Sequence, residues 1–188
     1  MIHNWRYSYE QTIYPGLRQH LLREFQPSDA EAIYHLTSQP EVYEFLPDWR
    51  STREQRLDWL TNYEVPDNEA FLSSLPTIGN GWLKLGIIEK ETGAFIGFCN
   101  TGIKEELPEP NREIAFAISK HHRNKGYTTT AVKGLIAFLV EQTDVKQLNA
   151  VVLPRNHASR WAIEKNGFRF CGNVEIDGEM HGHYVLST

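Results

Sequence analysis

The chain has 188 residues, 40% of them hydrophobic, and a formal net charge of −5 at pH 7. These values predict one domain over residues 1–188 with a sizeable core, and the acidic balance argues against a direct nucleic-acid partner. Because no run of 18 apolar residues and no signal-peptide pattern occurs, we also expect no membrane contact and a cytoplasmic location.

The N-terminal segment carries one strand pattern followed by one helix pattern. Residues 1–18 are rich in Trp and Tyr without a clear period, so they are either a short strand or an arm, over 1–17, that packs on the body. The stretch 20–25 is typical of a strand. A capping-box spacing at Ser28 and Glu31 then predicts the start of a helix.

The next segment is predicted to contain one more helix and then a long loop. We expect Pro40 to end the first helix. Ser51 and Glu54 repeat the capping-box spacing and predict a second helix. Residues 64–80 have two prolines and little pattern, which favours a surface loop.

Two apolar runs, 81–89 and 94–101, flank Lys90–Gly93, which indicates a β-hairpin with glycine at its turn. The loop 105–111 follows, with three carboxylates and two prolines. This loop is either a solvated rim or a rim that attracts a cationic amine.

The central stretch 112–131 reads as a strand, a basic turn and the start of a helix. Alternating apolar residues over 114–118 predict the strand, and helical spacing of apolar residues from Ala131 predicts the helix. A helix N-terminus presents free N–H donors and a positive dipole end, so it binds anions readily. Arg123 and Lys125 add charge, and Gly126 permits close approach to the backbone. The alternative is a plain strand–helix connection with solvated basic residues.

The C-terminal third predicts a buried strand over 147–153 and a further helix. Asn156 is a good N-cap for that helix and Gly167 a good C-terminal stop. Residues 170–174 and 181–186 then fit a closing antiparallel pair.

Two stretches resemble the signatures of one superfamily. Arg123–Thr128 is similar to the Arg/Gln-x-x-Gly-x-Gly/Ala pyrophosphate signature of the Gcn5-related N-acetyltransferases (GNAT), with Thr in the last position. Residues 156–168 match the second signature, Asn-x-x-Ser/Ala followed by a helix that ends Glu-Lys-x-Gly-Phe. The resemblance covers about residues 17–188, and the stretch 113–131 looks like the branch of ribosomal-protein N-terminal acetyltransferases (RimJ/RimL-like).

The resemblance implies an α/β fold: a twisted mixed sheet of six or seven strands, helices on both faces and a splayed central parallel pair. It implies an enzyme, an acyl-CoA-dependent N-acetyltransferase with acetyl-CoA as co-substrate. The cofactor-binding residues that it implies are Ala117, Ile118, Arg123, Asn124, Lys125, Gly126, Tyr127, Thr128, Thr129, Asn156 and Ser159.

Acyl transfer needs a base for the acceptor ammonium and a proton for the leaving thiolate. The branch often has a carboxylate at the start of the central strand, so Glu113 is the candidate base; its alternative is a charged strand end. Many GNAT members have a Tyr where this chain has Ile163. The resemblance therefore points to Ser159 as the thiol-proton donor, although a serine there could equally cap the helix.

The acceptor implied by the branch is a protein N-terminal amine, with a small-molecule amine or aminoglycoside as the alternative. A non-catalytic CoA-binding sensor or interaction module is the alternative from another class, and a homodimer is left open. Trp49, Trp59 and Tyr63 lie in the region that lines the acceptor cleft of GNAT folds. They either shape that pocket or belong to the core.

The remaining candidates are two histidines and two cysteines. His181 and His183 have strand spacing for two ligands but lack further support, so we expect no metal. Cys99 and Cys171 lie far apart in the chain, which predicts free thiols.

Overall fold

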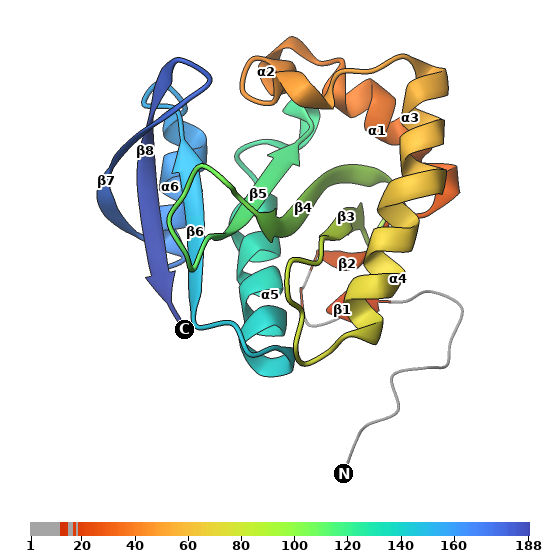
Figure 1. Cartoon of the computed structure of the whole chain (residues 1–188). Helices are drawn as coiled ribbons and strands as arrows, with labels where there is room; N and C mark the ends of the chain where they lie inside the picture. Colours follow the sequence, from red (N-terminus) through yellow and green to blue (C-terminus); the bar gives the residue numbers. More distant parts are fainter. Residues whose placement is uncertain (1–11, 15–16, 18) are drawn as a thin grey trace.

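The computed structural model describes residues 12–14, 17 and 19–188, and is shown in Figure 1. One eight-stranded sheet runs in the order β1-β2-β3-β4-β5-β6-β8-β7. Its strands are β1 (Thr12–Tyr14), β2 (His20–Glu24), β3 (Leu83–Glu89), β4 (Phe95–Ile103), β5 (Arg112–Ile118), β6 (Gln147–Val152), β7 (Arg169–Ile176) and β8 (Glu179–Ser187). The predicted α/β class with a mixed sheet is confirmed.

The extra strand relative to the expected six or seven is β1, which pairs antiparallel with β2. It falls within the predicted N-terminal arm. The rest of that arm, apart from Leu17, lies outside the described residues.

Six α-helices occur in the described part of the chain: α1 (Ala30–Thr37), α2 (Pro40–Tyr43), α3 (Arg53–Trp59), α4 (Val65–Ser73), α5 (Tyr127–Gln142) and α6 (His157–Lys165). Short 3-10 turns lie at Pro27–Asp29, Pro47–Trp49 and Lys120–His122, and a π-helical turn, η3 (Leu60–Glu64), joins α3 to α4. Among the described residues, no helix is both long and apolar enough to cross a bilayer.

Two hydrophobic clusters hold the helices to the sheet. The larger one joins α5 to β3, β4, β5 and β6, with Ala131, Leu135 and Leu139 of α5 fully buried against the sheet. The smaller one joins α1 to the sheet through Ile33 and Phe98. Each cluster removes apolar surface from water on a different side of β4, so helices cover the sheet from both sides.

The prediction of a loop over 64–80 was wrong, because α4 occupies Val65–Ser73. Pro66 lies at the start of α4, directly after the π-helical turn Leu60–Glu64, where the hydrogen bonds already depart from the regular α-helical pattern. Asn68 and Phe71 are the buried residues of this helix. Too few apolar residues face the core for the helical period to be visible in the sequence.

Both predicted capping boxes were displaced along the chain. The box of α3 is formed by Thr52 and Gln55, one residue later than predicted. The first helical turn is capped by Gln26 with Asp29, not by Ser28 with Glu31. Pro40 begins α2 rather than ending α1, because proline fits the first turn of a helix.

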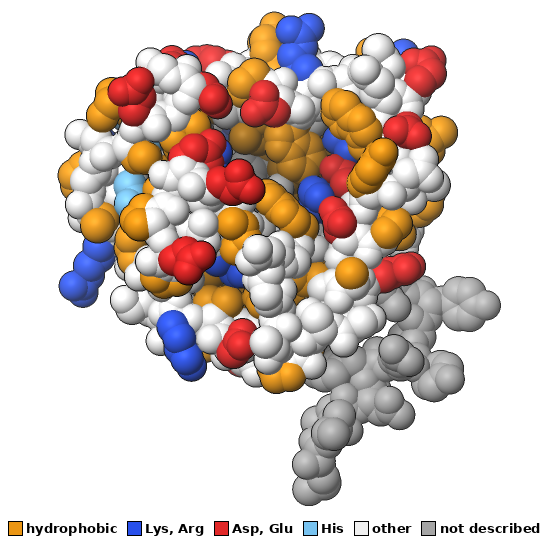
Figure 2. Space-filling model, in the orientation of Figure 1, with side chains coloured by type: hydrophobic (Ala, Val, Ile, Leu, Met, Phe, Trp, Pro, Cys, Tyr) orange, Lys and Arg blue, Asp and Glu red, His pale blue; other side chains and the backbone are white. Residues whose placement is uncertain are grey.

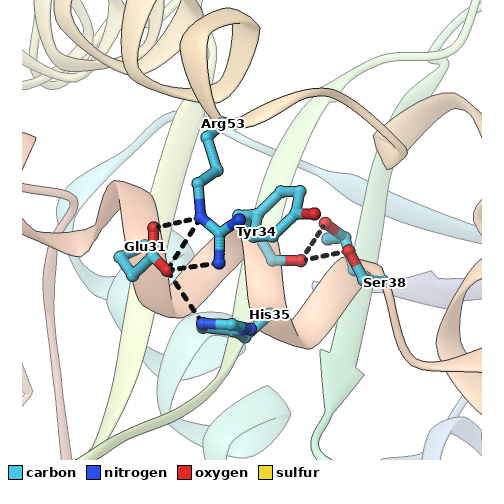
Figure 3. A network of polar contacts seen from close by, with 6 residues as sticks. Glu31, Tyr34, His35, Ser38 and Arg53 are labelled. Carbon is cyan, nitrogen blue, oxygen red and sulfur yellow. Dashed lines mark hydrogen bonds and ion pairs between the residues drawn. The ribbon is translucent and has the colours of Figure 1, made fainter.

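An ion-pair network joins α1 to α3 (Figure 3). Arg53 Nε donates to both carboxylate oxygens of Glu31 at 3.0 Å, and its guanidinium lies 4.5 Å from the ring centre of Tyr34. His35 Nε2 lies 2.8 Å from the same carboxylate. Because these side chains are exposed, the network contributes little to the free energy of unfolding, but it ties α3 to the helix that packs on the sheet.

The feature that organises the site is the junction of β5 and β6. These are the parallel neighbours, and they pair at one register position, Glu113 with Asn149. On its other side β5 pairs with β4 at seven positions, from Arg112 to Ile118. The two parallel strands therefore separate beyond Glu113, which is the splay that the resemblance implied.

Candidate active site

A cleft of about 1670 Å³ opens where β5 and β6 separate. Figure 2 shows a hollow with hydrophobic side chains at its floor and acidic side chains on its rim. Its lining comes from the separated strands, from the first turns of α5 and α6, and from the segment that contains α2 and α3. Residues far apart in the sequence thus meet around one opening.

The basic turn before α5 has the backbone geometry of an anion site. Asn124 and Gly126 both have positive φ, 61° and 81°, and α5 begins directly after Gly126. Gly126 offers no side chain, so the N–H groups of the first turn of α5 lack a side-chain cap. A compact anion placed there would receive these donors and the positive end of the helix dipole.

The side chains of this turn are divided between the cleft and solvent. Arg123, Asn124, Gly126, Tyr127, Thr128 and Thr129 line the cleft. Lys125 is exposed and is absent from this lining. The side chain of Arg123 donates to the carbonyl of Glu41 at 2.8 Å. Arg123 therefore also joins the turn to the start of α2.

Tyr127 anchors the turn to the sheet. Its hydroxyl donates to Glu89 Oε1 at 2.8 Å, and its buried ring meets His20 edge-on with 5.5 Å between ring centres. Thr92 donates to the other oxygen of Glu89 at 2.8 Å. These contacts fix the first residue of α5 to the end of β3.

The side of β5 that faces β6 is an exposed strand edge inside the cleft. Ala117 and Ile118 line the cleft, while their backbones pair with Phe98 and Gly97 of β4. Since β5 and β6 pair only at Glu113, the edge beyond that residue keeps backbone groups for a ligand. An extended chain of amides can add to such an edge as a further strand would.

Glu113 lies at the point where the strands part, and its side chain lines the cleft. Burial raises the pKa of its carboxyl to about 7, and Glu106 adds to this rise. The Lys104 ammonium and a hydrogen bond from the Val151 backbone act against the rise in pKa. A carboxyl with a pKa near neutrality is suited to accept a proton at physiological pH.

Ser159 and Asn156 lie together at the start of α6. Asn156 is the N-cap, and its Oδ1 accepts the backbone N–H of Ser159 at 3.1 Å, as the sequence predicted for the cap. Both residues line the cleft, and the side chain of Ser159 is partly accessible. Ile163, which replaces the common Tyr, is fully buried in the core.

The opposite end of the cleft is aromatic. Trp49 stacks on Phe98 with 4.1 Å between ring centres, and both Trp49 and Trp59 line the cleft. Tyr63 is 60% exposed and does not belong to the lining. Of the three predicted aromatics, two therefore face the cleft, and Trp49 also packs on the core.

Sequence reasoning missed a buried ion pair in this wall of the cleft. Arg56 is only 1% exposed and pairs with Glu64, and its guanidinium lies between Trp49 and Trp59, 5.6 and 5.4 Å from the two ring centres. All four side chains line the cleft. The eight-residue separation of Arg56 and Glu64 across η3 gives no motif that would have revealed the pair.

The predicted acidic loop contributes part of the rim. Glu105 and Glu106 line the cleft, whereas Glu109 does not. Lys104 lies 3.0 Å from Glu106 and neutralises part of its charge. The sequence placed three carboxylates in one loop, and two of them face the cleft.

His181 and His183 each contact another residue of the chain. His183 Nε2 lies 2.9 Å from Asn149 Oδ1, and His181 Nδ1 lies 3.0 Å from the carbonyl of Glu179. Within the described residues, no group of three or more His, Cys, Asp or Glu side chains is arranged to hold a metal ion. Cys99 is buried and Cys171 exposed, and both are free thiols as predicted.

These features define a class of protein. A helix start with uncapped N–H donors, an open strand edge and a carboxyl of pKa about 7 meet in one cleft at a splayed parallel pair. That combination suits an enzyme that binds a long anionic ligand with amide groups along its length and that removes a proton from a second substrate.

Comparison with known proteins agrees with this class. The profile of the acetyltransferase (GNAT) domain matches residues 20–169. The uncharacterized N-acetyltransferase YnaD of Bacillus subtilis is 24% identical over 149 residues, which cover 79% of this chain and 78% of YnaD. The "Probable spermine N(1)-acetyltransferase" of Bacillus subtilis subsp. natto is 31% identical over 93 residues, which cover 46% of this chain and 60% of that protein.

A solved structure of AAC(6')-Ib with acetyl-CoA and an aminoglycoside has a TM-score of 0.70 at 18% identity, covering 90% of this chain and 94% of that one. The chain belongs to the GNAT acetyltransferase family. It is an acetyl-CoA-dependent N-acetyltransferase.

Proposed function

We propose that this enzyme acetylates a protein N-terminal amine, with Glu113 as the base and Ser159 as the donor of a proton to the leaving thiolate. The observation that carries the proposal is the position of Glu113, which faces the cleft where β5 and β6 part and has a carboxyl pKa of about 7. Burial of the carboxyl and its access to the cleft together favour proton transfer over a purely structural role.

The residues of this chain fit acetyl-CoA. The left-handed backbone at Gly126 and the uncapped start of α5 suit the pyrophosphate, and Arg123 supplies positive charge beside them. The open edge of β5 at Ala117 and Ile118 suits the amides of the pantetheine arm. When bound, acetyl-CoA supplies the activated acetyl group as a thioester.

In the proposed mechanism Glu113 accepts a proton from the acceptor ammonium, directly or through a water molecule, and so frees the lone pair that attacks the thioester carbonyl. The C–N bond forms and the C–S bond breaks. Ser159, in the first turn of α6, gives its proton to the departing sulfur. The second proton that the nitrogen loses as the amide forms restores the Ser159 hydroxyl through solvent, and Glu113 releases its proton to solvent. Asn156 holds the backbone of Ser159 in the cleft through the cap bond of 3.1 Å.

Two observations support a polypeptide acceptor. The cleft, at about 1670 Å³, exceeds the roughly 300–1,000 Å³ of ordinary small-molecule pockets, so it has room for more than acetyl-CoA. The sequence of the basic turn and of the strand–helix unit around it also resembles the branch that acetylates ribosomal proteins.

A second candidate is a polyamine or aminoglycoside acceptor. The relatives favour it, since one matched protein is named for spermine and the matched AAC(6')-Ib structure contains an aminoglycoside. Both acceptor classes are cationic, and the rim with Glu105 suits cations of either kind.

A panel separates these acceptors. CoA release from acetyl-CoA would be measured with peptides of varied N-terminal residue, the same peptides with blocked N-termini, spermine, and kanamycin. We expect kcat/KM to be highest for peptides with a free N-terminus. A higher kcat/KM for spermine or kanamycin would move the assignment to the small-molecule class, and binding of acetyl-CoA without CoA release in any arm would favour the sensor.

The acidic rim predicts a preference for cationic acceptors. Replacing Glu105 and Glu106 together with Lys should lower kcat/KM for a basic peptide about tenfold, mainly through KM, with a smaller effect at high salt because the field is screened over about 8 Å. Steady-state kinetics with matched basic and acidic peptides measures this. Glu109→Lys is the matched control, since Glu109 belongs to the same loop but lies outside the cleft lining. An unchanged ranking of the two peptides in the double variant would contradict the prediction.

The proton-donor role of Ser159 predicts a selective loss of turnover. Ser159→Ala should lower kcat by about 10- to 100-fold with less than a threefold change in KM, because a proton donated to the leaving thiolate matters mainly in the transition state. The cap is preserved, since it uses the backbone N–H of Ser159. If kcat equals that of the wild type in steady-state assays, Ser159 only belongs to the first turn of α6.

A further inference from the structure

Asn149 occupies the single point where β5 and β6 pair, and its side chain is fully buried. The amide nitrogen donates to the carbonyls of Pro110 and Arg112 at 2.9 and 3.0 Å. Both carbonyls belong to the chain that enters β5 immediately before Glu113. A side chain of β6 therefore makes bonds to β5 of the kind that a regular parallel ladder makes with its backbone.

The hydrogen-bonding capacity of this amide is filled. Oδ1 of Asn149 lies 2.9 Å from His183 Nε2 on β8 and accepts from Gln147 Nε2 at 3.2 Å. Since two carbonyls face the amide nitrogen, the orientation of the amide is fixed, and Oδ1 must be the acceptor toward His183. His183 therefore carries a proton on Nε2 in this contact, and it holds the amide from the side away from β5.

We propose that Asn149 is a positioning residue for the reaction. Its side chain links the entry of β5 to β6, so that the strands part beyond Glu113 and the Glu113 carboxyl is held at the point where they separate. His183 supports this link by donating to Oδ1 of Asn149. This inference rests on the proposed role of Glu113 as base. The link that the Asn149 side chain makes between β5 and β6 is a property of the strand junction, and its effect can be measured separately.

The pKa of the Glu113 carboxyl reports on the link between Asn149 and β5. Lys104 and Glu106, from the loop after β4, are the charged groups that act on this carboxyl, and the Val151 backbone of β6 donates a hydrogen bond to it. Burial is the largest cause of its raised pKa. Releasing the strands would admit water to the carboxyl and would lower its pKa from about 7 toward the ordinary value of 4.5.

The test is Asn149→Ala in the whole chain, with the Glu113 carboxyl followed by 13C NMR titration and assigned with Glu113→Gln. We expect the pKa of Glu113 to fall by at least one unit, the acid limb of the kcat/KM profile to move to lower pH by a similar amount, and kcat to fall at least tenfold. A pKa of Glu113 equal to that of the wild type would overturn the proposal.

Asn68→Ala is the matched control. Asn68 is buried and also clamps a strand with its amide, since it donates to the Lys84 carbonyl at 2.8 Å and accepts the Lys84 N–H at 2.7 Å. Its loss should lower the thermal midpoint without moving the Glu113 titration. An equal shift of the Glu113 pKa in this control would reduce Asn149 to general stability and overturn the proposal.

A milder pair of variants decides the matter if Asn149→Ala does not fold. His183→Leu removes the donor to Oδ1 and should shift the Glu113 titration down by about half a unit, whereas His183→Gln keeps a donor and should lie closer to the wild type. An unchanged Glu113 pKa in His183→Leu would count against the positioning role of Asn149. Full activity of Glu113→Gln would instead remove Glu113 as base, and the NMR titration would still judge the position of its carboxyl.

Discussion

Glu113→Gln is expected to lower kcat by at least 100-fold, because general-base catalysis contributes about 10²- to 10⁴-fold and glutamine cannot accept the proton. The wild-type kcat/KM should rise with pH through an apparent pKa near 7, since the Glu113 carboxyl must be ionised to act and burial raises its pKa to about 7. In the variant this limb should disappear. Steady-state kinetics from pH 5.5 to 9 with a peptide acceptor measures both effects.

Two controls separate catalysis from folding. Glu105→Gln removes another cleft carboxyl, and it should keep kcat within about threefold. The thermal midpoint of Glu113→Gln at pH 8 should not fall. The pKa of Glu113 is raised in the folded protein, so its ionised form is disfavoured there and costs stability as pH rises above about 4.5 toward 7. A Glu113→Gln enzyme with wild-type kcat and an unchanged pH profile would exclude Glu113 as the base.

Gly126→Val is expected to weaken acetyl-CoA binding at least tenfold, or about 1.4 kcal/mol. The backbone of Gly126 has φ 81°, which a β-branched residue adopts only with strain. A Cβ added there would meet no protein atom within 4 Å, so the added methyl groups would stand in the space that we assign to the pyrophosphate. Titration calorimetry on the folded variant measures the change in Kd.

Gly93→Val is the control for Gly126→Val, because it introduces a comparable backbone strain away from the cleft. Gly93 has φ 70° in the hairpin turn between β3 and β4, and a Cβ there also meets no atom within 4 Å. It lies outside the cleft lining, so the variant should lose comparable stability while the Kd for acetyl-CoA stays within about twofold. Equal Kd values for Gly126→Val and the wild type would remove the pyrophosphate from this turn.

The parts of the fold that the sequence predicted well are those with local physical causes. Asn156 caps α6 and Gly167 adopts φ 90° at its end, because a cap and a left-handed stop depend on a few neighbouring residues. Gly126 at the start of α5 follows the same reasoning. The predicted capping boxes were wrong by one or two residues. Ser51 and Thr52 can both cap a helix, and the sequence pattern alone does not select between them.

The candidate site was predictable mainly where a family motif marked it. The turn from Arg123 to Thr128 and the start of α6 carry such motifs, and both line the cleft. The buried pair of Arg56 and Glu64 and the amide of Asn149 carry none, because their partners come from distant elements. Whether a charged or amide side chain is buried and paired is decided by tertiary packing, which a single sequence does not show.

The open edge of β5 has a further consequence for the protein before it meets its cofactor. Unpaired strand edges attract other strands and so promote association between chains. Here the edge lies within the cleft, where it faces β6 and the segment of α2 and α3 rather than forming the outer border of the sheet. A narrow, amide-bearing ligand can therefore bind along this edge as an added strand. Because such a ligand binds the folded state, its binding free energy also stabilises the fold against unfolding.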